Sequence, residues 1–429
     1  MKKIVFIFFG RLTEEKGCDA LLECRKNIWL SDFSDRCLLH VFGDGDFSWA
    51  FVQLAQGSDC VSFHGWQWYD ILIDCLKGAD YCLMPSRFLE TFGLTALESL
   101  SHGVPVIWIQ HGGLKPFVMD ELDLWKHWKL DHEWMTLSWS LYHQIESCIK
   151  SVDQDLWVQW SKWARKVSCD FGEKEWLDCF LSQTGWSDVY GKNILLVSDY
   201  VTVLWGIETY LYKVQTLLEK QWAKVVILGA RVHRGVLWTL ERWLGLLWSI
   251  CNIPFALLLG MCVKKMKPDL VWYHSTLRFV GWFPIWWVGV RRRKKGSTDL
   301  SPRKVSGRKI AGQEGQRWKS WTMQTWMMYH DLWYFHPFPS RVYEEKDIAQ
   351  SLSLNSFVWS GLACFPSFFG RLFVLLSVPC KYFLLKLLHK VLAQFVDKHL
   401  VPSGFMLEYV KRFQQHERVV VLPHFLEKE

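Results

Sequence analysis

The 429-residue chain is long enough for two domains of ordinary size, and half of its residues are hydrophobic, which allows substantial buried cores. Its formal net charge of +7 comes without a recognised nucleic-acid-binding module, so a nucleic-acid partner is not expected. The thirteen cysteines are scattered, without a Cys-x-x-Cys pair, and no signal peptide is visible, so we expect reduced thiols and a cytoplasmic protein.

Residues 4–118 alternate short apolar strands with helical stretches, which is the pattern of a parallel α/β layer. The first strand, Ile4–Phe9, leads into the glycine-bounded loop Gly10-Arg-Leu-Thr-Glu-Glu-Lys-Gly17. Three further turn and strand-end patterns follow in order: Val41-Phe-Gly-Asp-Gly45, Phe63-His-Gly65 and Ala79–Ser86.

The stretch from Met84 to Val106 predicts a strand end, a loop and a short helix that ends near Gly103. Continuous helix would turn Glu90 and Glu98 apart, so we place Glu90 in the loop and Glu98 on the helix. A helix N-terminus after a Gly-containing loop attracts an anion. A carboxylate one turn into that helix accepts hydrogen bonds from sugar hydroxyls. Together these features suit a phosphate-plus-ribose ligand, such as a nucleotide.

Residues 119–190 are polar and Trp-rich, and we expect them to be helical, with an amphipathic helix at Phe171–Leu181. A second unit opens with the apolar strand Lys192–Asp199, and Gly206 lies in a loop before the next helix. Later strands and strand ends are expected at Lys224–Gly229, Lys267–His274, Met327–Leu332, Val401–Ser403 and Val419–His424.

Glu90 and Glu98, followed by Gly-Val-Pro-Val-Ile, resemble the paired-glutamate signature of family 4 glycosyltransferases, which are retaining enzymes of the GT-B fold. The loop Gly10–Gly17 resembles the phosphate-binding loop of that family, and this match covers residues 4–118. A patchier match runs from residue 192 to the end. The resemblance implies an α/β fold with two Rossmann-like domains, each a parallel sheet flanked by helices.

The two domains stand in the reverse of the family's order. Residues 1–190 resemble the donor-binding domain, which is C-terminal in the family. Residues 191–429 resemble the acceptor-binding domain, which is N-terminal there, with a basic insertion at 291–319. Two explanations stay open: a circular permutation, or a fusion of the tail of one glycosyltransferase to the head of another.

The resemblance also implies roles for particular residues. Glu90 and His330 would be catalytic residues that face the donor sugar, and His274 is a weaker candidate. Charged side chains would neutralise the leaving diphosphate, Glu98 would hold the ribose hydroxyls, and backbone N–H groups would meet the sugar and phosphate. The donor-binding residues are Arg11, Lys16, Phe92, Gly93, Leu94, Thr95, Glu98 and Gly206.

The implied reaction moves a hexose from a UDP- or GDP-sugar to a hydroxyl of a glycan or lipid-linked acceptor, with retention, in bacterial surface polysaccharide or glycolipid synthesis. No cofactor is implied, and no His, Cys or Asp cluster has metal-ligand spacing. Phosphorylase-like and epimerase-like proteins of the same fold fit less well, because no pyridoxal-lysine context is present and because the Gly10–Gly17 loop occurs together with the pair of Glu90 and Glu98. The non-enzyme alternative is an inactive or mis-joined fusion without a single competent cleft.

Two segments of the second unit bear on partners. Residues 291–319 hold eleven Lys or Arg against two acidic side chains, which indicates either a solvated loop or contact with anionic lipid at the inner face of the membrane. Residues 357–388 are strongly apolar but contain Arg371, Lys381, Pro366 and Pro379. We expect the prolines to break this stretch into a buried or interfacial helix pair rather than a membrane span.

Tryptophan is as common as glycine, with 28 of each, whereas glycine normally far outnumbers it. Some tryptophans stand where the family has a loop glycine, and Trp205 precedes Gly206 in this way. We hypothesise that the source organism reads UGA as glycine. The positions that carry this hypothesis are Trp49, Trp108, Trp205 and Trp333.

Overall fold

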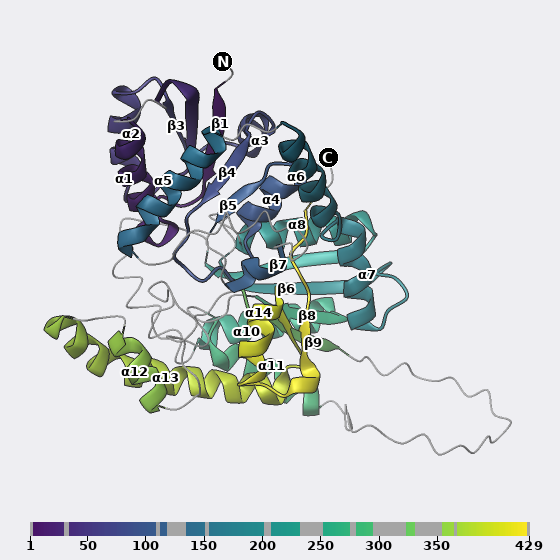
Figure 1. The fold of residues 1–429 in the computed structure, drawn as a ribbon. Coiled ribbons are helices and arrows are strands. Elements are labelled where there is room, and N and C mark those ends of the chain that lie inside the picture. Colours follow the sequence, from purple (N-terminus) through teal and green to yellow (C-terminus); the bar gives the residue numbers. More distant parts are fainter. Residues whose placement is uncertain are drawn as a thin grey trace.

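The computed structural model describes residues 3–29, 34–108, 112–117, 134–150, 154–200, 207–231, 252–274, 280–294, 323–330, 354–363 and 367–426. Within these ranges the chain builds two parallel β-sheets, of five and six strands, flanked by helices (Figure 1). The α/β class expected from the sequence is therefore confirmed.

The first sheet has the strand order β3-β2-β1-β4-β5. Its strands are β1 (Ile4–Phe9), β2 (Cys37–Phe42), β3 (Val61–Gly65), β4 (Tyr81–Met84) and β5 (Val106–Trp108). Successive side chains point to opposite faces of a strand. Phe6 and Phe8 of β1 accordingly join one buried cluster, whereas Ile7 and Phe9 join another. Helices must therefore cover both faces.

The helices of the first half are α1 (Cys18–Trp29), α2 (Ser48–Gln56), α3 (Tyr69–Lys77), α4 (Leu94–Ser101), α5 (Trp134–Lys150), α6 (Gln154–Cys169) and α7 (Glu173–Thr184). Helices α1 and α5 contribute to the cluster with Phe6, and α3 and α4 contribute to the cluster with Ile7. Helix α4 ends as expected, since Gly103 takes a left-handed φ of 76° just beyond it.

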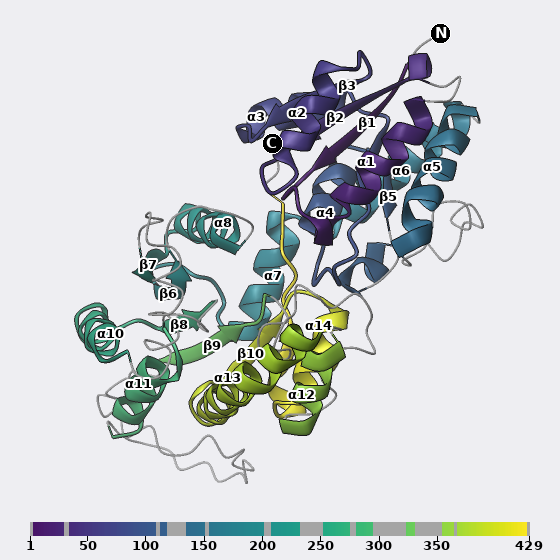
Figure 2. The same cartoon turned by 90° about the vertical axis from the view of Figure 1, so that its left-hand side faces the viewer.

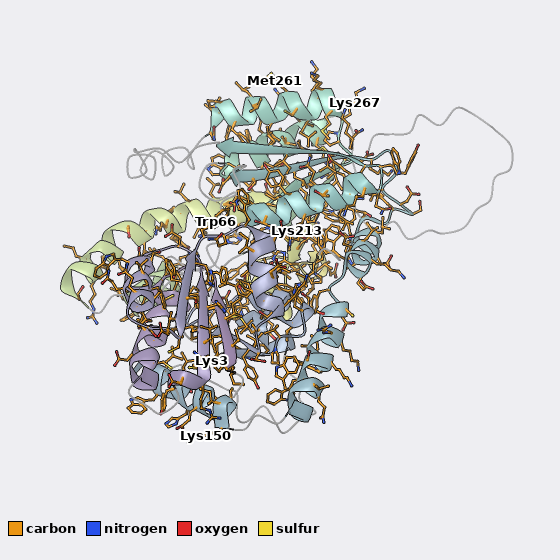
Figure 3. All side chains as sticks on the ribbon, turned by 90° about the horizontal axis from the view of Figure 1, so that it is seen from above. Lys3, Trp66, Lys150, Lys213, Met261 and Lys267 are labelled. Atoms are coloured by element: carbon orange, nitrogen blue, oxygen red, sulfur yellow. The ribbon has the colours of Figure 1, made fainter. Side chains whose placement is uncertain are left out.

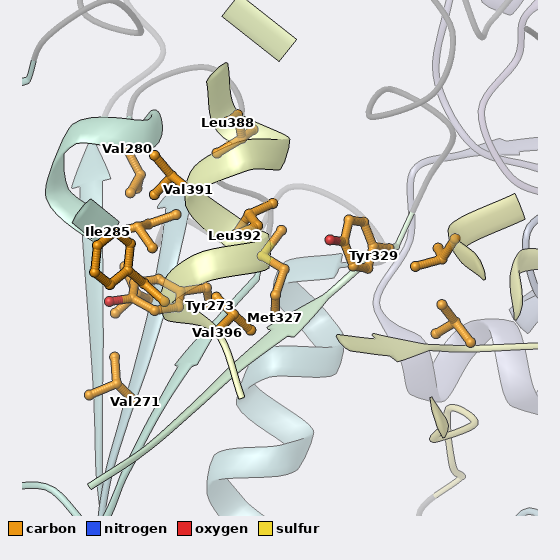
Figure 4. Packing of buried hydrophobic residues seen from close by; sticks show 14 of the residues in the cluster. Val271, Tyr273, Val280, Ile285, Met327, Tyr329, Leu388, Val391, Leu392 and Val396 are labelled. Carbon is orange, nitrogen blue, oxygen red and sulfur yellow. The ribbon is translucent and has the colours of Figure 1, made fainter. Parts of the chain in front are cut away.

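The second sheet has the order β11-β10-β9-β8-β6-β7. Its strands are β6 (Asn193–Tyr200), β7 (Lys224–Arg231), β8 (Leu270–Tyr273), β9 (Gln324–Met328), β10 (Lys398–Val401) and β11 (Val419–Val421). The helices around it are α8 (Ile207–Lys220), α10 (Ile253–Met266), α11 (Trp282–Lys294), α12 (Leu354–Ala363), α13 (Phe368–Phe395) and α14 (Gly404–Lys411). Figure 4 shows Tyr273, Met327 and Leu392 in the cluster between this sheet and α13.

The two halves are connected twice. Helix α7 follows the first sheet in sequence, but its Trp176 and Phe180 pack in a cluster with Trp272 of the second sheet. After β11 the chain returns to the first half, where the backbone N–H of Leu426 donates to the carbonyl of Phe171 at 2.9 Å. Figure 2 shows this last segment running from the second sheet toward the first.

The apolar segment forms helices as expected, but one detail of the prediction is wrong. Pro379 lies inside α13, which continues through it from Phe368 to Phe395. Proline removes the hydrogen bond to the carbonyl of Leu375. Leu375 is 52% exposed, so the lost bond lies on the solvent side of the helix. Across the described residues, no helix is both long and apolar enough to cross a membrane.

Most of the basic insertion lies outside the described residues. Its first part, residues 291–294, is the end of α11 rather than a loop. The guanidinium of Arg292 makes two hydrogen bonds to the carboxylate of Asp397, at 2.7 and 2.9 Å, so this cation is paired within the fold. The loop expected over residues 291–319 therefore does not begin at residue 291.

Some of the described tryptophans stand in backbone conformations that favour glycine, and others do not. Trp108 is buried in β5, and Trp49 lies in the first turn of α2, so neither position needs the backbone freedom of glycine. Trp205 and Trp333 lie outside the described residues. Trp222, which the sequence did not single out, has a left-handed φ of 64° just after α8. This conformation favours glycine.

Candidate active site

The site begins at the carboxyl edge of the first sheet, where ligands of open parallel sheets bind. The loop after β1 carries Lys16, and the loop after β4 carries Glu90. The ammonium of Lys16 contacts Glu90 Oε1, and Ser86 Oγ donates to the same oxygen at 2.9 Å. The structure thus joins two residues that the sequence predicted as parts of one site.

The two loops fit closely because of a glycine and a partly buried ion pair. A Cβ on Gly17 would lie 2.1 Å from the carbonyl oxygen of Pro85, so only glycine allows this approach. Arg87, which is 4% exposed, makes two 2.8 Å hydrogen bonds to the carboxylate of Asp19. Sequence reasoning missed Arg87 and Asp19, whose pairing only the fold reveals.

Arg11, by contrast, does not join the contact between Lys16 and Glu90 here. Its guanidinium lies 3.1 Å from a carboxylate oxygen of Glu15, and both residues belong to the same loop. Arg11 is nearly half exposed, so this surface pair contributes little to stability. The guanidinium is thus held on the loop that the sequence assigned to diphosphate binding.

Gly93 and the start of α4 form the next part of the site. Gly93 precedes α4 with a φ of 92°, and a Cβ there would lie 2.2 Å from Leu114 Cδ2. The first N–H groups of a helix have no partner within it. Leu94 and Thr95 begin this helix, and the ring of Phe92 just before it packs edge-on against His424 at 4.9 Å.

Glu98 lies on α4 and is half-buried. Burial raises the pKa of its carboxyl, and the positive charge of Lys213 opposes that shift. Lys213 belongs to α8, beside the second sheet (labelled in Figure 3). No sequence pattern singles out Lys213, because an isolated lysine in a helix is normally a solvated side chain.

Thr91 ties the first half to the second. Its Oγ1 donates a hydrogen bond of 2.7 Å to the carbonyl oxygen of His330, just beyond β9. Its own carbonyl oxygen accepts a hydrogen bond of 2.5 Å from Ser403 Oγ. Glu90 and His330, the two residues predicted to be catalytic, are therefore connected through a single intervening residue.

His330 belongs to a buried histidine cluster formed by His274, His330 and His424. His274 Nδ1 and His330 Nε2 are 2.8 Å apart. The rings of His330 and His424 are nearly parallel, with centroids 5.3 Å apart. Burial and the neighbouring histidines lower the pKa of His274 and of His330 well below the usual value. Burial also lowers the pKa of His424, to about 3. All three imidazoles are thus neutral at physiological pH.

Gly206 lies outside the described residues, so its predicted approach to the diphosphate stays a prediction. Helix α8 begins directly after it, at Ile207. Within the described ranges, no group of three or more His, Cys, Asp or Glu side chains is arranged to hold a metal ion.

Comparison with known proteins gives a partial family match. Residues 3–126 match the family model described as glycosyl transferases group 1. The D-inositol 3-phosphate glycosyltransferase of Geodermatophilus obscurus is 32% identical over 127 residues, which cover 27% of this chain and 28% of that protein. The glycogen synthase of Actinobacillus succinogenes is 36% identical over 121 residues, which cover 27% of this chain and 24% of that one.

Solved structures overlap weakly with this chain. The catalytic domain of the cholesterol-α-glucosyltransferase from Helicobacter pylori covers 38% of this chain, with 19% identity and a TM-score of 0.30. The Anabaena protein HepE in complex with UDP-glucose covers 38% of it, with 20% identity and a TM-score of 0.32.

The matching region contains Lys16, Glu90 and Glu98, and it ends before the second sheet begins. The chain spans only about a quarter of the length of the curated relatives that it matches. Residues 3–126 thus resemble the group 1 glycosyltransferases in sequence.

Proposed function

We propose that the chain is a retaining glycosyltransferase of the family 4 type, which moves a hexose from a nucleotide-sugar to an acceptor hydroxyl. The observation that carries this proposal is the connection through Thr91. It links the contact between Lys16 and Glu90 to His330, on the other side of the two-sheet fold. A cleft that draws residues from both sheets can hold a donor and an acceptor together.

Lys16 and Arg11 would bind the donor diphosphate. Each cation now contacts a glutamate, Lys16 with Glu90 and Arg11 with Glu15. A diphosphate carries more negative charge than one carboxylate, so it would compete for both cations. Their charge would matter most as the glycosidic bond breaks and negative charge builds on the leaving diphosphate.

The start of α4 would hold the rest of the donor. Glu98 would accept hydrogen bonds from the ribose hydroxyls. The backbone N–H groups of Phe92, Gly93, Leu94 and Thr95 would meet the phosphate and sugar oxygens, helped by the positive end of the helix dipole. Glu90 would face the sugar once the diphosphate has drawn Lys16 away.

In the proposed reaction the bond between the anomeric carbon and the diphosphate oxygen breaks. The acceptor hydroxyl forms its new bond on the same face of the sugar, and its proton passes to the departing diphosphate. His330 would stabilise the donor sugar from the second sheet. Since these groups act mainly by position and charge, small displacements of His330 or Glu90 should be costly.

The reversed domain order belongs to this proposal. A circular permutant would keep one cleft, whereas a mis-joined fusion would bring together surfaces that did not evolve side by side. Leu89 of the first half is fully buried in the cluster around the second sheet, and Leu426 of the C-terminal segment is buried in a cluster of the first half. This interlocking favours a permutant, with residues 1–190 and 191–429 as its two domains.

We further propose that the acceptor is a glycan or lipid-linked glycan at an anionic membrane surface. Four apolar side chains on α13 are at least one-third exposed: Leu372, Leu375, Phe383 and Leu387. The same helix carries Arg371, Lys381, Lys386 and Lys390 and no acidic residue. Exposed apolar groups beside cations suit an anionic lipid surface. The double variant L375S/F383S should release the protein from anionic vesicles in a flotation assay.

The activity is tested by nucleotide release from a panel of UDP-, GDP- and ADP-sugars. Release with one donor, lost in Glu98→Ala and kept in Glu175→Gln, would support the proposal. Glu175 is an exposed carboxylate of α7 and serves as the matched control. No release from any donor, by the chain as written and by Trp205→Gly, would contradict the proposed activity and leave the mis-joined fusion.

A further inference from the structure

The inference concerns the histidine cluster and rests on the proposed function. We propose that His274 is a positioning residue for His330. It occupies His330 Nε2 and fixes the ring, so that Nδ1 is the atom of His330 that meets the donor sugar. Nothing in the sequence distinguishes the two ring nitrogens, and only their contacts assign them separate roles.

The first support is the shared hydrogen bond. His274 Nδ1 and His330 Nε2 lie 2.8 Å apart, and both residues are more than nine-tenths buried. A bond at this distance needs one nitrogen with a proton and one without. His330 Nε2 is therefore already engaged, as donor or as acceptor, before any ligand arrives.

The second support comes from the number of N–H protons on the imidazoles of His274 and His330. Two neutral imidazoles carry two N–H protons, of which one lies in the shared bond. The other sits on an outer nitrogen, either His330 Nδ1 or His274 Nε2. Both outer nitrogens are buried, and neither has a hydrogen-bond partner among the described residues. A buried polar atom without a partner is costly, so these nitrogens are poised for a ligand.

The third support is that the ring of His330 cannot turn freely. Tyr210 packs against it with centroids 5.5 Å apart, and His424 stacks on it within 3° of parallel. Thr91 holds its backbone carbonyl from the first half. With ring and backbone both fixed, Nδ1 stays in one place. A sugar hydroxyl can donate or accept, so it pairs with either tautomer of His330.

Two pairs of variants separate this role from mere packing. Asparagine places its amide near the position of Nδ1, whereas glutamine reaches toward Nε2. His330→Asn should therefore keep more nucleotide release than His330→Gln. Likewise His274→Asn should stay within about 3-fold of the parent, whereas His274→Leu should lower kcat about 10- to 100-fold through loss of position. His416→Leu, at an exposed histidine, is the control.

A second measurement does not depend on activity. The ¹⁵N spectrum of the imidazoles should show His330 Nε2 shifting in His274→Leu and returning toward the parent value in His274→Asn. An unchanged His330 signal in His274→Leu would overturn the positioning role, and so would equal activity of His330→Asn and His330→Gln. If the parent released no nucleotide, the proposed function would fail, while the spectrum would still decide how His274 acts on His330.

Discussion

Thr91 Oγ1 donates a hydrogen bond to the carbonyl oxygen of His330 at 2.7 Å, although the two residues lie 239 positions apart in sequence. Thr91 follows Glu90 directly, and its own carbonyl accepts from Ser403. One residue of the first half therefore holds two residues of the second. This contact ties the chain next to Glu90 to the backbone of His330.

The Thr91 contact predicts a functional cost without loss of fold. Thr91→Val removes the hydroxyl but keeps the shape of the side chain. A lost hydrogen bond of this kind costs about 0.5 to 1.5 kcal/mol, or roughly 2- to 12-fold in rate. We expect kcat for nucleotide release to fall by that factor, with an unchanged circular dichroism spectrum. Thr216→Val, at an exposed position of α8, should have no effect.

The position of Lys16 predicts that its charge contributes to donor affinity. Lys16→Met would leave Glu90 without its cation and remove one charge from the diphosphate site. A charge-assisted hydrogen bond contributes about 1.5 to 3 kcal/mol, so nucleoside diphosphate binding should weaken roughly 10-fold or more in calorimetry. The loss should shrink at high salt. Affinity equal to that of the control Lys174→Met, at an exposed lysine of α7, would remove Lys16 from the site.

The sequence predicted those parts of the fold that local patterns determine. The strands β1 and β6, the loop position of Glu90 and the helix carrying Glu98 were confirmed, because periodicity and turn residues act over short stretches. Pro379 was assigned wrongly, because a helix packed on a sheet tolerates the loss of one hydrogen bond on its exposed side.

Contacts between distant residues could not be predicted in the same way. Neither the link from Thr91 to His330 nor the pair of His274 with His330 has a local signal, since each depends on how two sheets meet. The sequence favours His330 over His274 because only His330 is followed by an aspartate, Asp331. Lys213 was not selected at all, although its charge acts on Glu98 across the two halves.

The backbone conformation of Trp222 predicts that glycine at this position would make the protein more stable. Its φ of 64° is left-handed, and its side chain is 76% exposed, so the indole gains little from packing. A non-glycine residue in this conformation costs about 1 to 2 kcal/mol. Trp222→Gly should therefore raise the free energy of unfolding by about 1 kcal/mol, measured by urea denaturation.

Trp49→Gly is the matched control for Trp222→Gly. Trp49 is 73% exposed but lies in ordinary helix, where glycine is unfavourable by about 1 kcal/mol. Trp49→Gly should therefore destabilise the protein. A gain at position 222 with a loss at position 49 would show that only some tryptophans occupy glycine conformations. A loss at both positions would count against glycine as the residue that position 222 requires.

The buried histidines make stability depend on pH in a defined direction. Burial lowers the pKa of His424 from 6.5 to about 3, so the unfolded chain takes up a proton before the folded chain does. The stabilising contribution is full above pH 6.5 and is lost as pH falls toward 3. At pH 5 this histidine alone should cost about 2 kcal/mol of unfolding free energy. The raised pKa of Glu98 acts in the opposite direction, so the contribution of His424 must be isolated by substitution.

His424→Phe keeps an aromatic ring between Tyr210 and Phe92 and should flatten the slope of unfolding free energy against pH between pH 7 and 5, measured by urea unfolding. His416→Phe, at an exposed position, should leave the slope as it is. Equal slopes in the parent and in His424→Phe would mean that His424 does not stay neutral inside the fold.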